Sequence, residues 1–412
     1  MRVLLAAHPT VGHTTALTTV GRRLLARGTD VRFALPALPR PPFRAPEIIG
    51  TAARLPDTIA AAGLRVVRLR PAYRSLAYGV VLPFTTGATE LHVAARLFSS
   101  GAAHYVRALE AEIDADRADV MVADYLFFPA WLVAERRGLP FVAFYHSALP
   151  FPHEGHAPFA NADSLVRTLD SRLGRVRREL GLPPAPARML ERPYASHLNL
   201  LATAPALEGR DDDLGPRTRY VGPCTDGRVE QTSDFPFAQL RADAFKVYVS
   251  LGTVFNGSPS RFLALVRGIA SPGVQIVVSA GASYDAVVGL ASDDVLVFRR
   301  VPQLAVLRAV DAVVSHGGNN TVNETLAAGR PLLVLPIGGE QEANARRVEA
   351  IGAGITLDRA RLGPMHVREA FTRLRSTASF GERASRIAAA IDGMGGAEMA
   401  ADLIDKVGRG EC

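Results

Sequence analysis

Short apolar runs alternate along the first half of the chain with longer segments in which apolar side chains recur every three or four positions. That spacing predicts helices over residues 14–27 and 127–137, each followed by a glycine, Gly28 or Gly138, suited to ending a helix. The continuous apolar runs predict buried strands of a parallel sheet. These runs are residues 2–7, 30–35, 64–69, 118–123, 141–145 and 198–202.

The second half repeats this alternation without repeating the sequence. Helical spacing occupies residues 260–269, and the end of the chain is helical, with glycines splitting residues 383–392 from 397–407. Strands and helices in alternation predict a second doubly wound α/β domain. The apolar runs here are residues 246–250, 274–280, 295–299, 312–315 and 331–336.

Between the two halves lies a stretch rich in charge, proline and glycine, which predicts a linker. We therefore expect an N-terminal Rossmann-like domain over residues 1–205, a linker over 206–241, a C-terminal Rossmann-like domain over 242–392 and a final helix over 393–412. Residues 36–56, which lack clear periodicity, are expected to form a mobile loop followed by a short helix at 58–62.

Composition narrows the class of protein. The chain has 412 residues, 48% of them hydrophobic, and a formal net charge of +7. Its arginines are scattered among acidic residues, so we expect no nucleic-acid partner. Cys224 and Cys412 are too few and too far apart for a disulfide framework or a zinc site. No apolar run predicts a signal peptide or a membrane span, so a cytoplasmic protein is expected.

Residues 313–345 carry the clearest candidate chemistry. A buried strand breaks at His316-Gly317-Gly318, and a helix begins near Asn319. Free backbone N–H groups and the helix dipole at such a point favour an anion. The nearby amide of Asn320 and hydroxyl of Thr321 add donors, and Glu340 and Gln341 follow the next strand as a pair suited to binding sugar hydroxyls.

An alternative interpretation applies to part of this stretch. Thr321 and Glu324 have the spacing of a capping box, in which both side chains only tie off the start of a helix. The pair Glu340-Gln341 favours a ligand site instead, because it follows a strand where α/β sheets bind ligands.

His13 and Asp124 both follow predicted strands at the same edge of the first sheet. Asp124 could support the imidazole of His13 in taking up a proton, or it could merely cap the next helix. His8 is nearby, and a loop histidine is more often structural than catalytic. The site in the second half favours a catalytic role for His13 alone.

The pattern of residues 313–345 resembles the donor-binding signature of the family 1 (UGT-like) glycosyltransferases of the GT-B fold, bacterial natural-product group. The resemblance implies two Rossmann-like domains facing across a cleft and a last helix that crosses back to the first domain. It implies contacts from His316, Gly318, Asn319, Asn320 and Thr321 to the donor phosphates. Glu324 would bind the ribose, and Glu340 and Gln341 the sugar; the family more often has Asp at position 340.

Two further segments match the family in part. In Ser-Leu-Gly-Thr, Ser250 and Thr253 would approach the diphosphate. In Arg300-Val301-Pro302-Gln303, Val301 and Gln303 would meet the nucleobase. Arg300 replaces a frequent aromatic residue there, and its guanidinium plane can stack on a base or remain solvated.

The resemblance also implies that His13 is the catalytic base and Asp124 its support, although the family's proline after this histidine is missing. Aromatic residues in the first half are core by default, and some could line an apolar acceptor pocket. The candidates for acceptor contacts are Phe84, Tyr125, Phe128 and His146.

We therefore expect an inverting glycosyltransferase that moves a sugar from a UDP- or dTDP-sugar to a hydroxyl of a hydrophobic small molecule. No cofactor or metal is expected, and the protein should be a monomer or homodimer. A catalytically silent nucleotide-sugar binder that activates a partner, a sugar-nucleotide epimerase and an enzyme with a lipid-linked acceptor are the alternatives.

Overall fold

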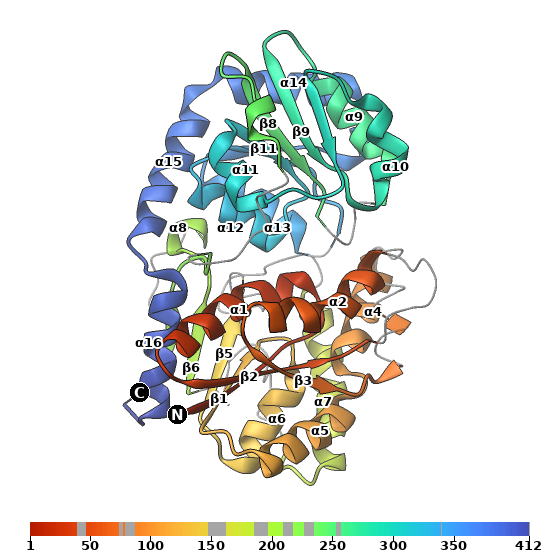
Figure 1. The fold of residues 1–412 in the computed structure, drawn as a ribbon. Helices are drawn as coiled ribbons and strands as arrows, with labels where there is room; N and C mark the ends of the chain where they lie inside the picture. The colour runs from red at the N-terminus through yellow and green to blue at the C-terminus, as the bar shows by residue number, and fades with distance from the viewer. Residues whose placement is uncertain are drawn as a thin grey trace. The chain divides into compact units, whose positions relative to one another are not determined.

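The computed structural model describes residues 1–38, 47–73, 77–78, 87–146, 162–184, 197–208, 217–225, 235–252, 257–338 and 340–411. The chain divides into two compact units, each built on one parallel sheet (Figure 1). Unit 1 comprises Met1–Ala204, Asp212–Gly227 and Met394–Cys412, and unit 2 comprises Pro205–Asp211 and Arg228–Gly393. Two Rossmann-like sheets are the architecture that the sequence predicts.

The sheet of unit 1 has its first strand near the centre. Its order is β3-β2-β1-β4-β5-β6-β7, and every neighbouring pair is parallel. The strands are β1 (Arg2–Ala6), β2 (Asp30–Pro36), β3 (Arg65–Leu69), β4 (Val120–Asp124), β5 (Phe141–Tyr145), β6 (Leu198–Leu201) and β7 (Thr218–Tyr220).

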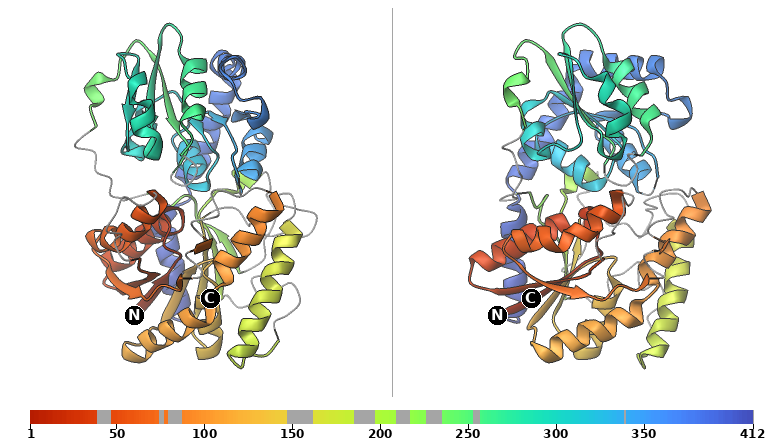
Figure 2. Two further views of the ribbon diagram at one scale, coloured as in Figure 1. Left: turned by 90° about the vertical axis from the view of Figure 1, so that its right-hand side faces the viewer. Right: turned by 45° about the vertical axis from the view of Figure 1, so that its right-hand side comes forward.

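Helices cover both faces of this sheet, as Figure 2 shows. Alternate residues of β1 point to opposite faces: Leu5 packs with Leu17 and Ile404 on one side, and Leu4 packs in the core on the other. Burial on both faces explains why the strands are continuously apolar. The helices are α1 (Val11–Ala26), α2 (Glu47–Ala61), α4 (Gly87–Ser99), α5 (Ala102–Ala115), α6 (Phe128–Arg137), α7 (Ala162–Glu179) and α16 (Gly396–Gly408).

The expectation of a mobile loop over residues 36–56 is wrong from Glu47 onward, where α2 begins. Pro56 lies inside this helix, at a cost of about 3 kcal/mol. Leu55 and Ile59 are buried by the same helix, and each contributes about 1.5–3 kcal/mol, which offsets the proline. Residues 39–46 of the expected loop lie outside the described residues.

The sequence also gave no sign of β7, which falls in the stretch expected to be a linker. Its residues Thr218, Arg219 and Tyr220 are only partly buried or exposed. β7 pairs with β6 alone and forms the edge of the sheet. An edge strand does not need the apolar run by which the other strands are recognised.

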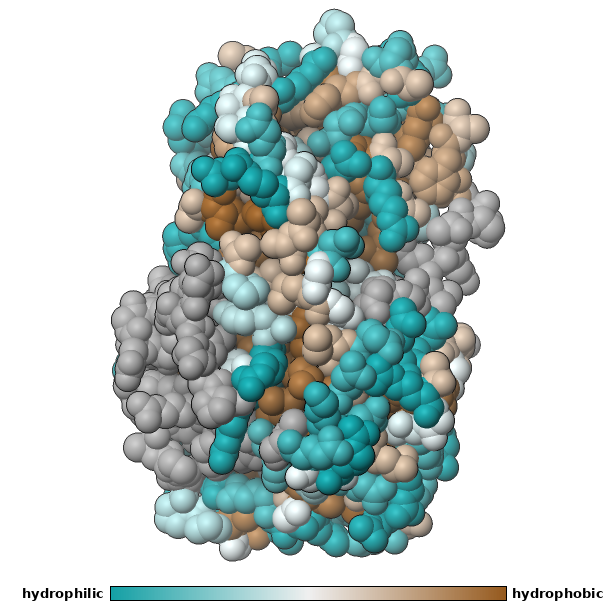
Figure 3. All heavy atoms as spheres, turned by 90° about the vertical axis from the view of Figure 1, so that its left-hand side faces the viewer, coloured by the Kyte–Doolittle hydropathy of each residue, from teal (hydrophilic) through white to brown (hydrophobic). Residues whose placement is uncertain are grey.

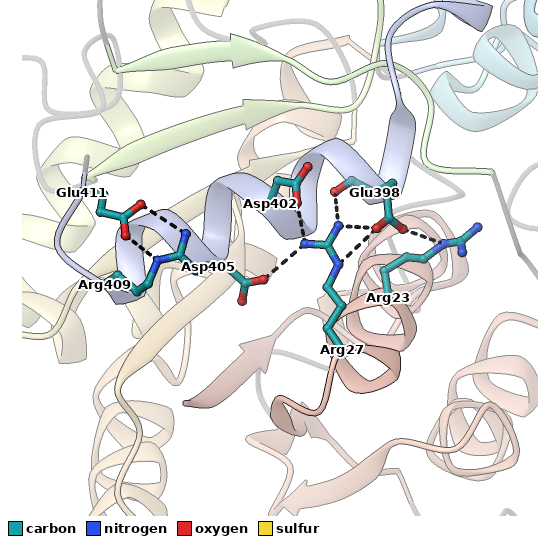
Figure 4. A network of polar contacts seen from close by, with 7 residues as sticks. All are labelled: Arg23, Arg27, Glu398, Asp402, Asp405, Arg409 and Glu411. Carbon is teal, nitrogen blue, oxygen red and sulfur yellow. Dashed lines mark hydrogen bonds and ion pairs between the residues drawn. The ribbon is translucent and has the colours of Figure 1, made fainter.

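The final helix returns to unit 1, as predicted, and packs against α1. Gly395 has a φ of 83° and lies between α15 (Ala378–Asp392) and α16. Figure 4 shows Arg27, near the end of α1, in contact with three carboxylates of α16. Its guanidinium lies 2.6 Å from Asp402 and 3.2 Å from Asp405, and it also pairs with Glu398.

The sheet of unit 2 has the order β10-β9-β8-β11-β12-β13, again all parallel. Its strands are β8 (Phe245–Ser250), β9 (Val274–Ser279), β10 (Val295–Phe298), β11 (Ala312–Ser315), β12 (Leu332–Val334) and β13 (Gly354–Thr356). The helices α9 (Pro259–Ile269) and α14 (Pro364–Ser376) pack on one face, and α11 (Gln303–Ala309) packs on the other. The helices α12 (Asn319–Ala327) and α13 (Gln341–Ala350) follow β11 and β12.

On the face that Figure 3 draws, hydrophobic and hydrophilic residues are interspersed over the described part of the surface. The most exposed large apolar side chains in the described part of the chain are Tyr73 and Met365. Among the helices that the structure describes, none combines the length and the apolar character that crossing a membrane requires.

Candidate functional site

In each unit, successive strands are first added on one side of the first strand, and the later strands are then added on its other side. In unit 1 the reversal lies between β1 and β4, and in unit 2 it lies between β8 and β11. Helices leave opposite faces of the sheet at such a switch point, so a crevice opens at the carboxyl ends of the two strands. The candidate residues of both halves follow these four strands or their neighbours.

Three polar side chains meet at the carboxyl edge of unit 1. Asp124 is the last residue of β4, and His146 directly follows β5. His13 lies in the first turn of α1, which begins at Val11, a few residues earlier than the sequence predicts. The register pairs Asp124 of β4 with Phe144 of β5, which brings His146 beside the aspartate.

The carboxylate of Asp124 lies between two imidazoles. Its Oδ1 is 2.9 Å from Nδ1 of His13, and its Oδ2 is 3.0 Å from Nδ1 of His146. The backbone N–H of Leu126 also donates to Oδ1, at 3.0 Å. The Asp124 side chain is 0% exposed, whereas that of His13 is 16% exposed.

The electrostatics favour an ionised aspartate. Burial alone raises the pKa of Asp124, but the imidazoles of His13 and His146 outweigh it and hold that pKa well below its usual value. A buried carboxylate with two ring nitrogens beside it therefore stays charged at neutral pH. It can fix the tautomer of each imidazole by accepting the Nδ1–H.

The contacts of His8 fit a structural role, as its sequence context suggests. Burial, and then the charge of His13, lower the pKa of His8 to about 4, so its ring is neutral. Its Nε2 donates to the carbonyl of Leu126 at 3.0 Å, and its ring packs edge-on against Phe98 and Phe127.

The predicted acceptor residues fall into different environments. Tyr125 stacks on Tyr145 with ring centroids 4.8 Å apart, and its ring lies 6.4 Å from that of His13. Phe128 is buried in the core against Trp131. Phe84 lies outside the described residues.

Three side chains at this edge could hold a metal ion by number and type of donor. The ligand atoms of His13, Asp124 and His146 lie within 4.8 Å of one another. The two ring nitrogens that face the carboxylate are already at hydrogen-bonding distance from it. Protons on these nitrogens therefore account for the arrangement as well as a metal ion would.

In unit 2, the ring of His316 lies between two glycines. A Cβ at Gly252 would come within 2.5 Å of the imidazole, and a Cβ at Gly318 would come equally close. No larger residue fits at either position without moving the ring. Burial lowers the pKa of His316 to about 4, so the imidazole is neutral. Its Nδ1 is buried and has no hydrogen-bond partner among the described residues.

Two serines hold the glycine loops that follow β8 and β11. The hydroxyl of Ser250 accepts a hydrogen bond from Gly252 N at 3.4 Å. The hydroxyl of Ser315 accepts one from Gly317 N at 3.1 Å. This shared turn brings both loops to the switch point. Thr253, the other predicted contact of the first loop, lies outside the described residues.

The capping-box interpretation of Thr321 and Glu324 does not hold, because α12 begins earlier, with Gly318 as its N-cap. Glu324 is buried and accepts a hydrogen bond from Gln303 Nε2 at 2.6 Å. Tyr248 in turn donates to Oε1 of Gln303 at 3.1 Å, which fixes the orientation of the amide. The structure therefore brings Gln303 and Glu324 together.

The other predicted donor residues surround these loops. Asn320 and Thr321 lie in the first turn of α12, and Glu340 directly precedes α13. Val301 packs at the edge of a core cluster, and its neighbour Arg300 is exposed.

The side-chain oxygen of Gln341 is used in hydrogen bonds to the backbone. Its Oε1 accepts hydrogen bonds from the backbone N–H groups of Ile337 and Gly338, at 2.8 and 3.2 Å. Its side-chain NH2 is therefore the part that remains suited to a ligand.

Sequence reasoning missed Asn344, a buried residue of α13. Its amide donates to the carbonyl of Gly317 at 2.8 Å and to Oδ1 of Asn319 at 2.7 Å. This contact orients the amide of Asn319 at the start of α12. No helix was predicted over these residues, so the sequence offered no signal for this contact.

Comparisons with known proteins show similarity in both sequence and fold. Residues 265–405 match the C-terminal domain model of the erythromycin biosynthesis protein CIII-like family. The 4'-demethylrebeccamycin synthase of Lentzea aerocolonigenes is 29% identical over 420 residues, covering 94% of each chain. The oleandomycin glycosyltransferase of Streptomyces antibioticus is 29% identical over 412 residues, covering 97% of this chain and 89% of the relative.

A solved structure described as the glycotransferase of kitacinnamycin superposes with a TM-score of 0.76 at 25% identity, covering 98% of each chain. The fold likeness and the two sequence relatives extend over nearly the whole chain, and the matched domain model includes the glycine loop that follows β11. The chain is therefore a glycosyltransferase of the GT-B fold, and over nearly its whole length it is similar to enzymes of the bacterial natural-product group of family 1.

Proposed function

We propose that this glycosyltransferase moves a sugar from a UDP- or dTDP-sugar to a hydroxyl group of a hydrophobic natural product, with inversion at the anomeric carbon. The observation that carries the proposal is the pairing of His13 with the buried carboxylate of Asp124 at 2.9 Å. It supports a general base in unit 1, the unit expected to bind the acceptor.

The base acts through the outer nitrogen of its ring. Asp124 accepts the Nδ1–H of His13, which leaves Nε2 as the nitrogen that takes a proton. Nε2 removes the proton of the acceptor hydroxyl as the oxygen attacks the anomeric carbon. The ionised Asp124 stabilises the imidazolium that results, and such assistance contributes about 10²–10⁴-fold in rate.

The bond from the anomeric carbon to the diphosphate breaks as the new bond forms, and the electron pair leaves with the nucleoside diphosphate. A single displacement without a protein nucleophile inverts the configuration. The mechanism requires the anomeric carbon of a donor held by unit 2 to meet the oxygen that His13 activates.

Unit 2 stabilises the leaving group with hydrogen-bond donors and not with a metal ion. The neutral ring of His316, whose buried Nδ1 has no partner among the described residues, supplies a hydrogen-bond donor. The first backbone N–H groups of α12, at Asn319 and Asn320, point out of the helix start and carry its positive dipole end. Donors fixed in place before the charge develops are the most effective kind.

The nucleoside and the sugar occupy flanking positions in this proposal. Glu324 binds the ribose hydroxyls, and Gln303, held by Tyr248 and Glu324, meets the base edge beside Val301. Arg300 is exposed and stacks on the base. The sugar hydroxyls bind Glu340 and the side-chain NH2 of Gln341.

The acceptor class follows from the aromatic surroundings of His13 and from the relatives. Phe98 and Tyr125 lie beside the imidazole, with ring centroids 6.2 and 6.4 Å from it. Rings at this distance suit an apolar aglycone. The names of both sequence relatives point to natural-product chemistry.

The test is product formation. The purified protein is incubated with single UDP- and dTDP-sugars and a panel of apolar hydroxylated natural products, and products are identified by mass spectrometry and their anomeric configuration by NMR. We expect a glycoside of inverted configuration. Retention of configuration would contradict the single displacement, and an altered nucleotide sugar without transfer would favour an epimerase.

A further inference from the structure

The carboxylate of Asp124 contacts two imidazoles, one with each oxygen. His13 faces its Oδ1, together with the backbone N–H of Leu126, and His146 faces its Oδ2 at 3.0 Å. Both histidines approach through Nδ1. The sequence predicted His146 as an acceptor contact, but its ring is buried and the nitrogen nearest the backbone is directed to the carboxylate.

The two rings are close enough to influence each other. Their centroids lie 4.5 Å apart at an interplanar angle of 69°. His13 comes from α1 and His146 from the end of β5, so two elements on either side of Asp124 deliver them. A third hydrogen bond on the aspartate, from its neighbour Leu126, leaves the carboxylate little freedom to rotate.

We propose that His146 is a positioning residue for the base: its Nδ1–H holds the second oxygen of Asp124 and so keeps the first oxygen aimed at His13. This inference rests on the proposed role of His13. A carboxylate without the second bond can turn about its Cβ–Cγ axis, and the tautomer of His13 is then held less firmly. Groups that orient a reactive side chain from behind it typically contribute about 10–100-fold to activity.

The other titratable groups beside this trio in the described structure are the neutral His8 and the phenols of Tyr125 and Tyr145. None of them supplies a further charge at neutral pH.

Two variants test the hydrogen bond from His146 to Asp124, one by keeping the donor and one by removing it. His146→Asn places an amide N–H close to the position of Nδ1, so it keeps the hydrogen bond but cannot carry a charge. His146→Phe keeps a ring of similar bulk and removes the donor. With the wild-type donor and acceptor pair, kcat, the acceptor KM and the pH profile of kcat/KM are measured, and thermal unfolding verifies that both variants fold.

The expected results differ for the two variants. His146→Asn keeps kcat within about threefold, because the amide still donates to Oδ2 of Asp124. His146→Phe lowers kcat by about 10-fold or more with little change in the acceptor KM. A raised acceptor KM at unchanged kcat in both variants would overturn the inference and make His146 an acceptor contact, as would wild-type kcat and pH profile in His146→Phe.

A measurement without turnover distinguishes failure of this inference from failure of the proposed function. In ¹⁵N-histidine-labelled protein free of substrate, NMR reports the tautomer of each ring. We expect His13 and His146 both to carry their proton on Nδ1 in the wild type, and His13 to lose this preference in His146→Phe. A proton held equally on Nδ1 of His13 in His146→Phe would contradict the inference even if His13 proves to be the base.

Discussion

At the scale of single residues, burial sets the protonation of the groups in both sites. Asp124 remains ionised because the imidazoles of His13 and His146 outweigh the cost of burying its charge. His8 and His316 remain neutral because nothing comparable compensates their burial. The same residue type is therefore paired with a buried carboxylate in one place and buried without charge in two others.

The neutral histidines predict a loss of stability in weak acid. In the unfolded chain each imidazole takes up a proton as the pH falls through about 6.5, whereas in the folded chain the pKa of His8 is about 4. Between those values the unfolded chain binds more protons, so the free energy of unfolding decreases as the pH falls from 6.5 toward 4, by about 1 kcal/mol per pH unit for each group. Above pH 6.5 this contribution does not change.

His8→Gln tests this, because the glutamine amide can still donate to the carbonyl of Leu126 but does not titrate. Urea unfolding at pH 6.5 and pH 5 should show a smaller pH dependence in this variant than in the wild type. His104→Gln, at a partly exposed histidine bonded to the carbonyl of Arg70, is the control and should match the wild type. An equal slope in His8→Gln would show that His8 is not buried neutral.

At the scale of elements, both sites are built in the same way. A strand near the centre of each sheet ends at the switch point, and the next strand along the sheet brings the second half of the site. In unit 2, Ser250 and Ser315 hold matching glycine loops, and Gly252 and Gly318 leave room for the ring of His316. The glycines of the family pattern are therefore explained by the space that one imidazole occupies.

Gly318→Ala should weaken nucleotide binding by about 10-fold, or about 1.4 kcal/mol. Gly318 has φ −64°, which alanine adopts without strain, so the effect comes from the new methyl group against His316 Nε2, 2.5 Å away. Affinities for UDP and dTDP are measured by calorimetry. Gly257→Ala is the matched control, because a Cβ there meets nothing within 4 Å. Wild-type affinity in Gly318→Ala would exclude His316 as a phosphate contact.

The sequence predicted more of the elements than of the contacts between them. The apolar runs identified the central strands, and the glycine loops after β8 and β11 marked the donor site. The pairing of His146 with Asp124 and of Asn344 with Asn319 could not be predicted, because each depends on where a side chain points across two neighbouring elements. The start of α2 was missed because Pro56 outweighed a short buried face in the sequence pattern.

At the scale of the whole molecule, the last helix belongs to the first unit. The chain enters α16 beside the segment that follows β7, where Gly396 N donates to the carbonyl of Val221 at 2.8 Å. Gly222, with φ +85°, lies directly against Met394, where a side chain would collide with it. The Arg27 network of Figure 4 then ties the helix to α1.

Arg27→Gln should lower the stability of unit 1 by about 1 kcal/mol, since exposed ion pairs contribute about 0–1 kcal/mol each and three carboxylates of α16 lose their partner. Thermal unfolding at low salt should show this loss, and 1 M NaCl should reduce it because salt screens the pairs. Arg23→Gln, which removes only one contact to Glu398 at 3.5 Å, should have a smaller effect. Equal stability of Arg27→Gln and the wild type at low salt would show that apolar packing alone holds α16.

The proposed chemistry depends most directly on the imidazole of residue 13. The decisive measurement is the rate of sugar transfer by His13→Ala, with a donor and acceptor that the wild type uses and with the dissociation constant of the nucleoside diphosphate determined in parallel. We predict a rate at least about 100-fold below the wild type with nucleotide affinity unchanged, because only the base is lost. Transfer at the wild-type rate would contradict the assignment of His13 as the general base and with it the role given to Asp124.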